Sequence, residues 1–144
     1  MDSLTNFFYR FGYNGKNCRN NIILLPSDEI LYFVAKVAVI FNDQQQQQRF
    51  YSEHTDEIRS IAQHPNQWII ATGQISGGTE EDLSHVRIWD SKILVTLNVL
   101  EFDSAGFSVE CMDFCEVSIE QYFFDLFPFE FTRITNIIRI LLST

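Results

Sequence analysis

The amino-acid sequence predicts a mainly β protein, and three observations support this class. Between residues 50 and 100, four short apolar or β-branched segments alternate with turns. A histidine precedes the first segment, a threonine lies in the second and a Trp-Asp pair ends the third (His54, Thr72, Trp89-Asp90). This order is typical of a WD-type blade, a four-stranded unit that stacks with others into a β-propeller. A blade takes about 40–45 residues and a propeller has about four to eight blades. The 144 residues therefore predict an incomplete propeller.

The first forty residues predict a lead-in, a turn and a β-hairpin. Asn14-Gly15 favours a turn because both residues tolerate positive φ. A short apolar run at 22–25 stops at Pro26-Ser27-Asp28, and a longer run at 30–41 follows. A helix over 30–41 is possible, but its β-branched and aromatic residues favour a strand. The two runs therefore predict a hairpin.

The strands of the predicted blade follow at regular intervals. We expect them at 58–62, 68–72, 86–89 and 93–100, with polar turns or loops between them. Residues 107–115 predict the first strand of a next blade. The glutamine run at 44–48 predicts a solvated loop, because five residues are few for a self-pairing segment.

The C-terminal tail fits two periods. Phe127, Phe129 and Phe131 alternate as in a strand, whereas Phe131, Ile134 and Ile138 repeat at helical spacing. We predict strand before residue 131 and a possible short C-terminal helix from about residue 132. Charged residues interrupt the apolar tail, which argues against a transmembrane segment.

The blade motif also predicts a hydrogen-bonded chain of side chains within the sheet. His54, Thr72 and Trp89 stand at suitable positions, since Trp can only donate whereas Thr both accepts and donates. An Asp before the third strand usually completes the chain. The candidate here is Asp82, one residue further from Trp89 than usual, and Leu83 occupies the expected position. We expect this network to fix strand register, and we do not expect His54 to act as a catalytic base.

Residues 11 to about 115 resemble the echinoderm microtubule-associated-protein-like family. The resemblance is carried by several segments: Phe11-Gly12-Tyr13-Asn14-Gly15, Cys18-Arg19-Asn20-Asn21, residues 29–35, 48–51 and 54–58, Ala71-Thr72-Gly73-Gln74 and residues 85–91. The first part is similar to the hydrophobic HELP motif of that family. The resemblance implies tandem propellers in full-length relatives, with the HELP segment packed between or under blades. It also implies tubulin or microtubules as the partner, and a cytoplasmic, cytoskeletal location.

These features divide the chain into five parts. They are a lead-in (1–10), a HELP-like segment (11–49), a WD-type blade (50–100), the start of a second blade (101–118) and a divergent Phe/Ile-rich tail (119–144). We expect that further blades or self-association are needed, because open sheet edges favour pairing.

The resulting hypothesis is a non-catalytic scaffold that binds tubulin or microtubules. The alternative is a general WD-repeat interaction module without tubulin contact. Candidate contact residues lie on the HELP-like segment, since Arg and Tyr are over-represented in interface hot spots. They are Tyr13, Arg19, Tyr32 and Lys36. Packing against blades is the alternative role for Tyr13 and Tyr32.

Composition argues against several other classes. The net charge is −9, with −1 over residues 1–60 and −8 over residues 61–144. An acidic chain without a basic stripe argues against binding to nucleic acid or an anionic membrane. The number and spacing of the three cysteines match neither a disulfide framework nor the two closely spaced ligand pairs of a zinc site. This fits a reducing cytosolic setting. We expect no metal, cofactor or catalytic grouping, and therefore no enzyme.

Overall fold

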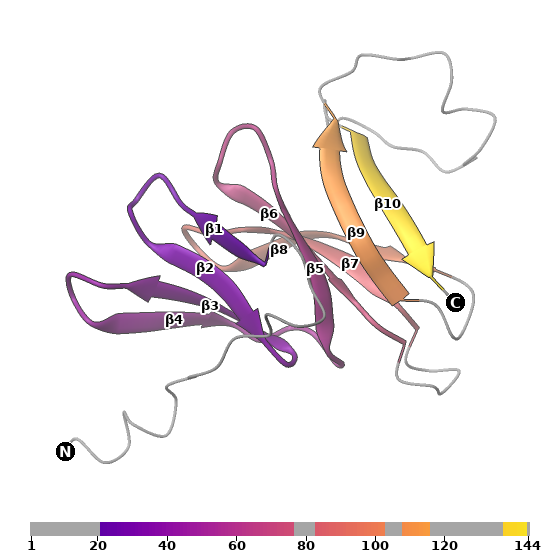
Figure 1. Cartoon of the computed structure of the whole chain (residues 1–144), viewed down its shortest axis with the longest axis horizontal. Coiled ribbons are helices and arrows are strands. Elements are labelled where there is room, and N and C mark those ends of the chain that lie inside the picture. The colour runs from indigo at the N-terminus through magenta and orange to yellow at the C-terminus, as the bar shows by residue number, and fades with distance from the viewer. Residues whose placement is uncertain (1–20, 77–82, 103–107, 116–136, 144) are drawn as a thin grey trace.

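The computed structural model describes residues 21–76, 83–102, 108–115 and 137–143. Within these ranges the chain forms ten β-strands and their turns, with no helix, so the mainly β class is confirmed. The strands form three antiparallel sheets (Figure 1). No helix in the described ranges is long and apolar enough to cross a lipid bilayer.

The three sheets follow one another along the chain. Sheet A contains β1 (Ile22–Leu24), β2 (Ile30–Val34), β3 (Val37–Asn42) and β4 (Gln47–Tyr51), in that order. Sheet B contains β5 (Ile58–Gln63), β6 (Ile69–Gln74), β7 (His85–Asp90) and β8 (Val95–Glu101), also in sequence order. Sheet C pairs β9 (Ser108–Cys115) with β10 (Ile137–Ser143).

The apolar run at 30–41 is two strands, so the single strand predicted there is wrong. The chain reverses at Ala35 and Lys36, and Ala35 has a φ of 51° in the left-handed region. No Gly, Pro or Asn marks this turn in the sequence. A tertiary contact supports it instead, because the amide of Ile58 donates to the carbonyl of Ala35 at 2.9 Å.

The glutamine run is partly turn and partly strand, so the loop predicted over 44–48 is too long. β4 begins at Gln47. The turn before it is held by side chains: the amide of Gln45 donates to Asn42 Oδ1 at 2.9 Å, and Gln46 Nε2 donates to the Asp43 carbonyl at 2.7 Å. Such local hydrogen bonds are the reason that Asn and Asp favour turns.

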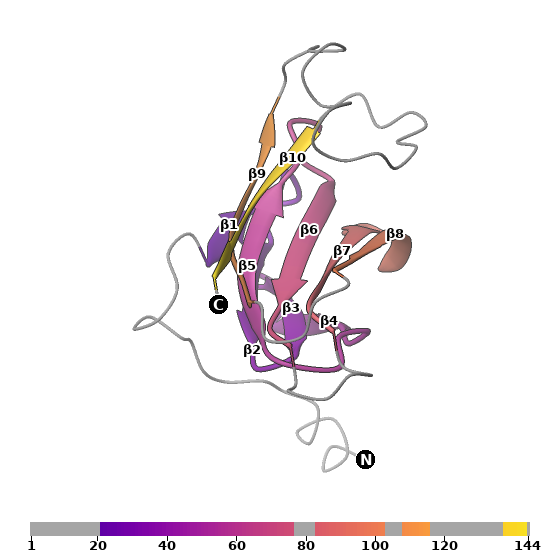
Figure 2. The ribbon, with the colours of Figure 1, turned by 90° about the vertical axis from the view of Figure 1, so that its right-hand side faces the viewer.

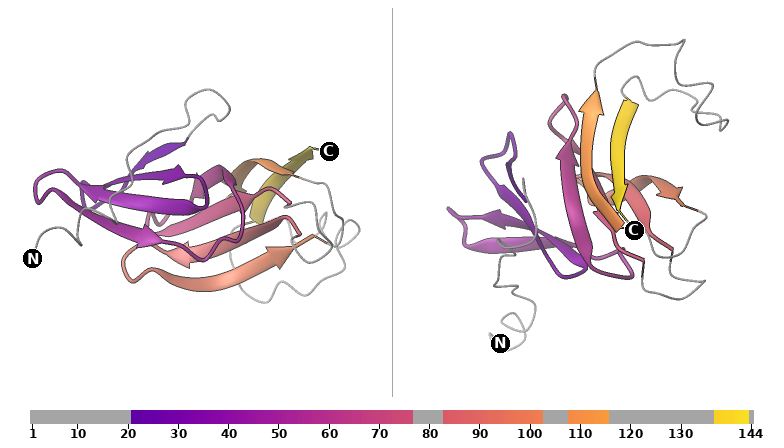
Figure 3. Two further views of the ribbon diagram at one scale, coloured as in Figure 1. Left: turned by 90° about the horizontal axis from the view of Figure 1, so that it is seen from below. Right: turned by 45° about the vertical axis from the view of Figure 1, so that its right-hand side comes forward.

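Sheet B lies between sheet A and sheet C, and it is covered on both faces (Figures 2 and 3). One core fills the space between sheets A and B; its buried members are Leu25, Leu31, Phe33, Ala38, Ile40, Tyr51, Ile58, Ile61, Ile70 and Trp89. A second core lies between sheets B and C and contains Ala62, Ala71, Val86, Ile88, Val109, Met112 and Phe114. Each sheet thus covers its neighbour as blades do, an arrangement consistent with a partial β-propeller.

β9 approaches β5 and β6 closely because a glycine leaves room for it. A Cβ added at Gly73 would lie 2.5 Å from Val109 Cγ1, which is too short for two carbon atoms. Ser60 Oγ donates to the Val109 carbonyl at 2.6 Å, and this bond joins the strand to sheet B. β5 and β9 consequently lie side by side and run in the same direction (Figures 1 and 2).

The C-terminal helix predicted from about residue 132 is wrong over Ile137–Ser143, which form strand β10. β10 pairs antiparallel with β9, with Ile138 opposite Phe114 and Arg139 opposite Asp113. Strand β9 presents unpaired backbone groups that a strand can satisfy and a helix cannot, which explains why the helical spacing does not prevail. The strand predicted before residue 131 lies outside the described residues.

Candidate functional site

A buried chain of hydrogen bonds crosses sheet B and joins three of the residues singled out in the sequence. Trp89 Nε1 donates to Thr72 Oγ1 at 3.1 Å, and Thr72 Oγ1 lies 2.6 Å from His54 Nε2. Trp can only donate, so Thr72 accepts from Trp89 and donates its own proton to His54. All three side chains are buried, and the network therefore holds β6, β7 and the segment before β5 in one register.

The network ends on Gln74, which the sequence did not single out for this role. His54 Nδ1 lies 2.8 Å from Gln74 Oε1, a carbonyl oxygen that can only accept, so Nδ1 carries the proton. Gln74 is held in turn by Thr55, whose amide donates to Gln74 Oε1 at 3.1 Å and whose hydroxyl accepts from Gln74 Nε2 at 2.9 Å. Asp82, which was expected to complete the chain, lies outside the described residues.

This environment keeps His54 neutral. Burial lowers the pKa of His54 to about 4, although its hydrogen bond to Gln74 acts in the opposite direction. The His85 ring stacks on the His54 ring with centroids 5.4 Å apart, and the charges of His85 and Arg87 also lower the pKa. A neutral, fully hydrogen-bonded imidazole in a closed core is suited to a structural role.

The depressed pKa of His54 predicts that acid weakens the fold. An unfolded histidine has a pKa of about 6.5, so as the pH falls the unfolded chain binds a proton before the folded chain does. The contribution is fully present above about pH 6.5 and is lost as the pH falls toward 4. We expect the free energy of unfolding to drop by roughly 2 kcal/mol between about pH 7 and pH 5. Urea unfolding at a series of pH values measures it.

The matched control is His54→Gln, which removes this titration and leaves His64 and His85 in place. Its free energy of unfolding should fall less steeply with acid than that of the parent chain. Equal slopes for the two chains would mean that His54 is not held neutral in the fold.

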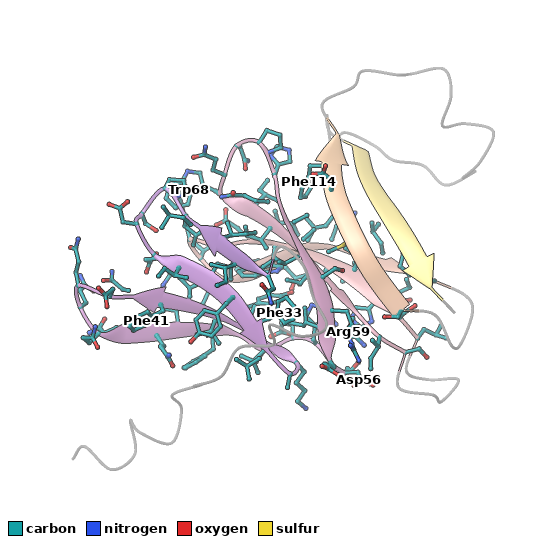
Figure 4. The ribbon with its side chains drawn as sticks, viewed as in Figure 1. Phe33, Phe41, Asp56, Arg59, Trp68 and Phe114 are labelled. Atoms are coloured by element: carbon teal, nitrogen blue, oxygen red, sulfur yellow. The ribbon has the colours of Figure 1, made fainter. Side chains whose placement is uncertain are left out.

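Sheets A and B are joined by a pair of stacked aromatic rings. The rings of Tyr51 and Trp89 lie 4.2 Å apart, centroid to centroid, and are inclined by only 4°. The hydroxyl of Tyr51 hydrogen-bonds to Thr96 Oγ1 at 2.6 Å, so the Tyr51 side chain reaches past β7 to β8. Burial raises the pKa of Tyr51 above its ordinary value. Phe33 adds to the same core from β2 (Figure 4).

A second link between the two sheets is ionic. Arg49 Nη2 pairs with Glu29 Oε2 at 2.8 Å within sheet A. Its Nη1 donates to the carbonyls of Ser91 and Lys92, at 3.1 and 3.0 Å, in the turn before β8. One guanidinium thus connects the β1–β2 turn to the β7–β8 turn. This contact could not be predicted from the sequence, because Glu29 and Arg49 are distant from residue 91 along the chain.

Two of the four candidate contact residues lie on the β2–β3 hairpin of sheet A. Tyr32 is half-buried and pairs across the sheet with Ile22 and Val39, on the face opposite to sheet B. Its hydroxyl accepts from Gln48 Nε2 at 3.2 Å, and burial raises its pKa. Lys36 is exposed in the turn. Tyr13 and Arg19 lie outside the described residues.

The two ends of sheet B carry different surfaces. At one end Lys92 Nζ lies 3.9 Å from the centre of the Trp68 ring, and the His64 and Phe114 rings meet edge to face at 5.0 Å. Arg59 lies at the other end of β5 (Figure 4). No cluster of His, Cys, Asp or Glu that could hold a metal ion occurs in the parts of the chain that the structure describes.

Comparison with known proteins confirms the resemblance inferred from the sequence. A family model described as the HELP motif matches residues 6–39. Echinoderm microtubule-associated protein-like 2 of Homo sapiens is 48% identical over 107 residues, which cover 72% of this chain and 16% of that protein. Echinoderm microtubule-associated protein-like 4 of Mus musculus is 47% identical over 107 residues, covering 72% and 11% respectively.

A third relative gives the same result. The 77 kDa echinoderm microtubule-associated protein of Strongylocentrotus purpuratus is 44% identical over 110 residues, or 76% of this chain and 16% of that protein. The chain thus spans between 11% and 16% of the length of these three relatives.

Proposed function

We propose that this chain is part of a non-catalytic scaffold that binds tubulin or microtubules. It carries a HELP motif and continues into a blade similar to those of the echinoderm microtubule-associated-protein-like proteins. One observation carries the proposal. The similarity to proteins named for microtubule association covers about three-quarters of the chain at 44–48% identity. A location in the cytoplasm, on the microtubule cytoskeleton, goes with this function.

The packing supports a binding role in preference to a catalytic one. Three of the buried polar side chains in and beside sheet B, those of His54, Thr72 and Gln74, are used in hydrogen bonds to one another. The proposal therefore assigns partner contact to exposed side chains on a rigid sheet. Lys36 is the most suitable of the described candidates, since it is exposed in a turn and its removal leaves the cores untouched. Tyr32 is half-buried, and its removal would also disturb the sheet.

Co-sedimentation with polymerised tubulin tests the proposal. The parent chain should pellet with the polymer, and Lys36→Gln should pellet several-fold less, because a lost charge at an interface rim slows association. Gln44→Glu is a matched control, since it changes the net charge by the same amount. Gln44 is exposed at the β3–β4 turn, at the other end of β3 from Lys36.

The outcomes separate tubulin binding from a general interaction module. If the parent chain pellets with the polymer, and Gln44→Glu retains this pelleting whereas Lys36→Gln loses it, the result supports contact through sheet A. No pelleting of the parent chain, together with no capture of free tubulin dimer, would contradict the proposal and favour a WD-type module with another partner. If both variants lost pelleting to the same extent, Lys36 would be excluded as a specific contact.

A further inference from the structure

The outer strand of sheet B is an open edge with apolar side chains. β8 is last in the strand order and pairs on one side with β7. Among the described residues, five large hydrophobic side chains are strongly exposed, and three of them (Ile93, Val95 and Leu97) belong to β8 or to the turn before it. The exposed fractions of these three lie between 49% and 66%. An edge of this composition is a template for pairing with another strand.

We propose that two copies of this chain associate through β8, edge to edge and antiparallel. The charges at the two ends of the strand support this partner and this direction. Lys92 lies just before β8 and Glu101 is its last residue, and both are exposed. Antiparallel pairing brings Lys92 of one copy near the partner's Glu101, and the same contact occurs twice. Parallel pairing would instead place like charges together, which is unfavourable.

The symmetry of this pairing limits it to a dimer. Both copies use the same strand, so the contact is isologous and leaves no second β8 edge to recruit a third copy. The register of β7 against β8 shifts between Ile88 and Trp89, and a bulge of this kind twists an edge and restricts the length of a new ladder. We therefore expect a small interface and a weak, concentration-dependent dimer.

The contact between the Lys92 ammonium and Trp68 does not prevent Lys92 from pairing with Glu101 of a second copy. The ammonium lies 3.9 Å from the centre of the ring, and such contacts at exposed sites are weak. The side chain remains exposed, so it can meet a carboxylate from a second copy.

Size-exclusion chromatography with light scattering tests the proposal on the full 144-residue chain. From about 10 to about 500 μM we expect the mass to rise from that of a monomer, 16.8 kDa, toward twice that value, as befits a small interface. Lys92→Glu and Glu101→Lys each place like charges together at both contacts. Each should raise the dissociation constant by roughly tenfold.

Charge reversal in both partners provides the decisive comparison. An equimolar mixture of the two single variants restores opposite charges at both contacts, and so does the double variant. Both should recover the dimer, which a general loss of folding could not produce. Leu97→Lys should abolish the dimer, whereas Leu24→Lys, at a still more exposed position on β1, should retain it.

A parent chain that stays monomeric up to the highest concentration would overturn the proposal. So would a dimer that both single charge variants leave unchanged, or one that Leu24→Lys removes and Leu97→Lys does not. These results are independent of tubulin, and a failure of the proposed function would leave them unaffected.

Discussion

Replacing Trp89 by alanine is expected to destabilise the chain by roughly 3–5 kcal/mol, enough to unfold a marginally stable domain. Trp89 is fully buried, stacks on Tyr51 at 4.2 Å and donates to Thr72. Its loss leaves a cavity between sheets A and B and removes a donor from the network. Equilibrium unfolding in urea, followed by far-ultraviolet circular dichroism, measures the change in the free energy of unfolding.

Trp68→Ala is the matched control, since Trp68 is the other tryptophan of the chain. Trp68 is half-buried at the β5–β6 turn and is covered by Lys92. We expect Trp68→Ala to cost less than about half as much as Trp89→Ala, because the cost scales with buried surface. Similar losses for the two variants would contradict the buried, inter-sheet position of Trp89.

Thr72→Val should cost roughly 2–5 kcal/mol, although it changes little but one hydroxyl group. The valine would leave two buried partners unsatisfied, the Nε1–H of Trp89 and the Nε2 of His54, and each unpaired group costs about 1–3 kcal/mol. Thr72→Ser keeps the hydroxyl and should recover most of the loss. The measurement is again the urea midpoint at neutral pH.

Thr96→Val is the control that separates the cost of breaking the His54–Thr72–Trp89 network from the cost of losing any threonine hydroxyl. Thr96 also makes one side-chain hydrogen bond, to the hydroxyl of Tyr51, but it is only part-buried. We expect a loss of about 1 kcal/mol or less at this site. If Thr72→Val proved no more costly than Thr96→Val, the network would not be a main source of order in sheet B.

The strands of sheet B could be predicted from the sequence because its turns contain residues with a strong local preference for turns. His64-Pro65-Asn66 ends β5, and the amides of Trp68 and Ile69 donate to Asn66 Oδ1 as in other Asn turns. Asp90 does the same for the turn before β8, where its Oδ1 accepts from Lys92. These bonds are local, so residue type alone is informative.

Features that depend on distant contacts were not predictable in this way. The turn at Ala35 is supported by Ile58, and Arg49 joins turns that are far apart in sequence. β10 is a strand because β9 lies beside it, although the spacing of its apolar residues also fits a helix. In each case the deciding partner is identified only once the chain is folded.

The hydrogen-bonded network could likewise be predicted only in part. His54, Thr72 and Trp89 could be identified because their types and spacing are those of a WD-type blade. Gln74 could not, since nothing in its type distinguishes an acceptor for His54 from an ordinary strand residue. The segment Ala71-Thr72-Gly73-Gln74 drew attention as part of the family resemblance, but its last residue carried no assigned role.

Sheets A and B pack face to face, as adjacent blades of a propeller do. Nuclear Overhauser effects between the ring protons of Tyr51 and the indole protons of Trp89 test it most directly. Assignment is simple because the chain has two tryptophans and Trp68→Phe removes one of them. Rings stacked at 4.2 Å should give strong cross-peaks. Two well-folded sheets without these cross-peaks would contradict the account.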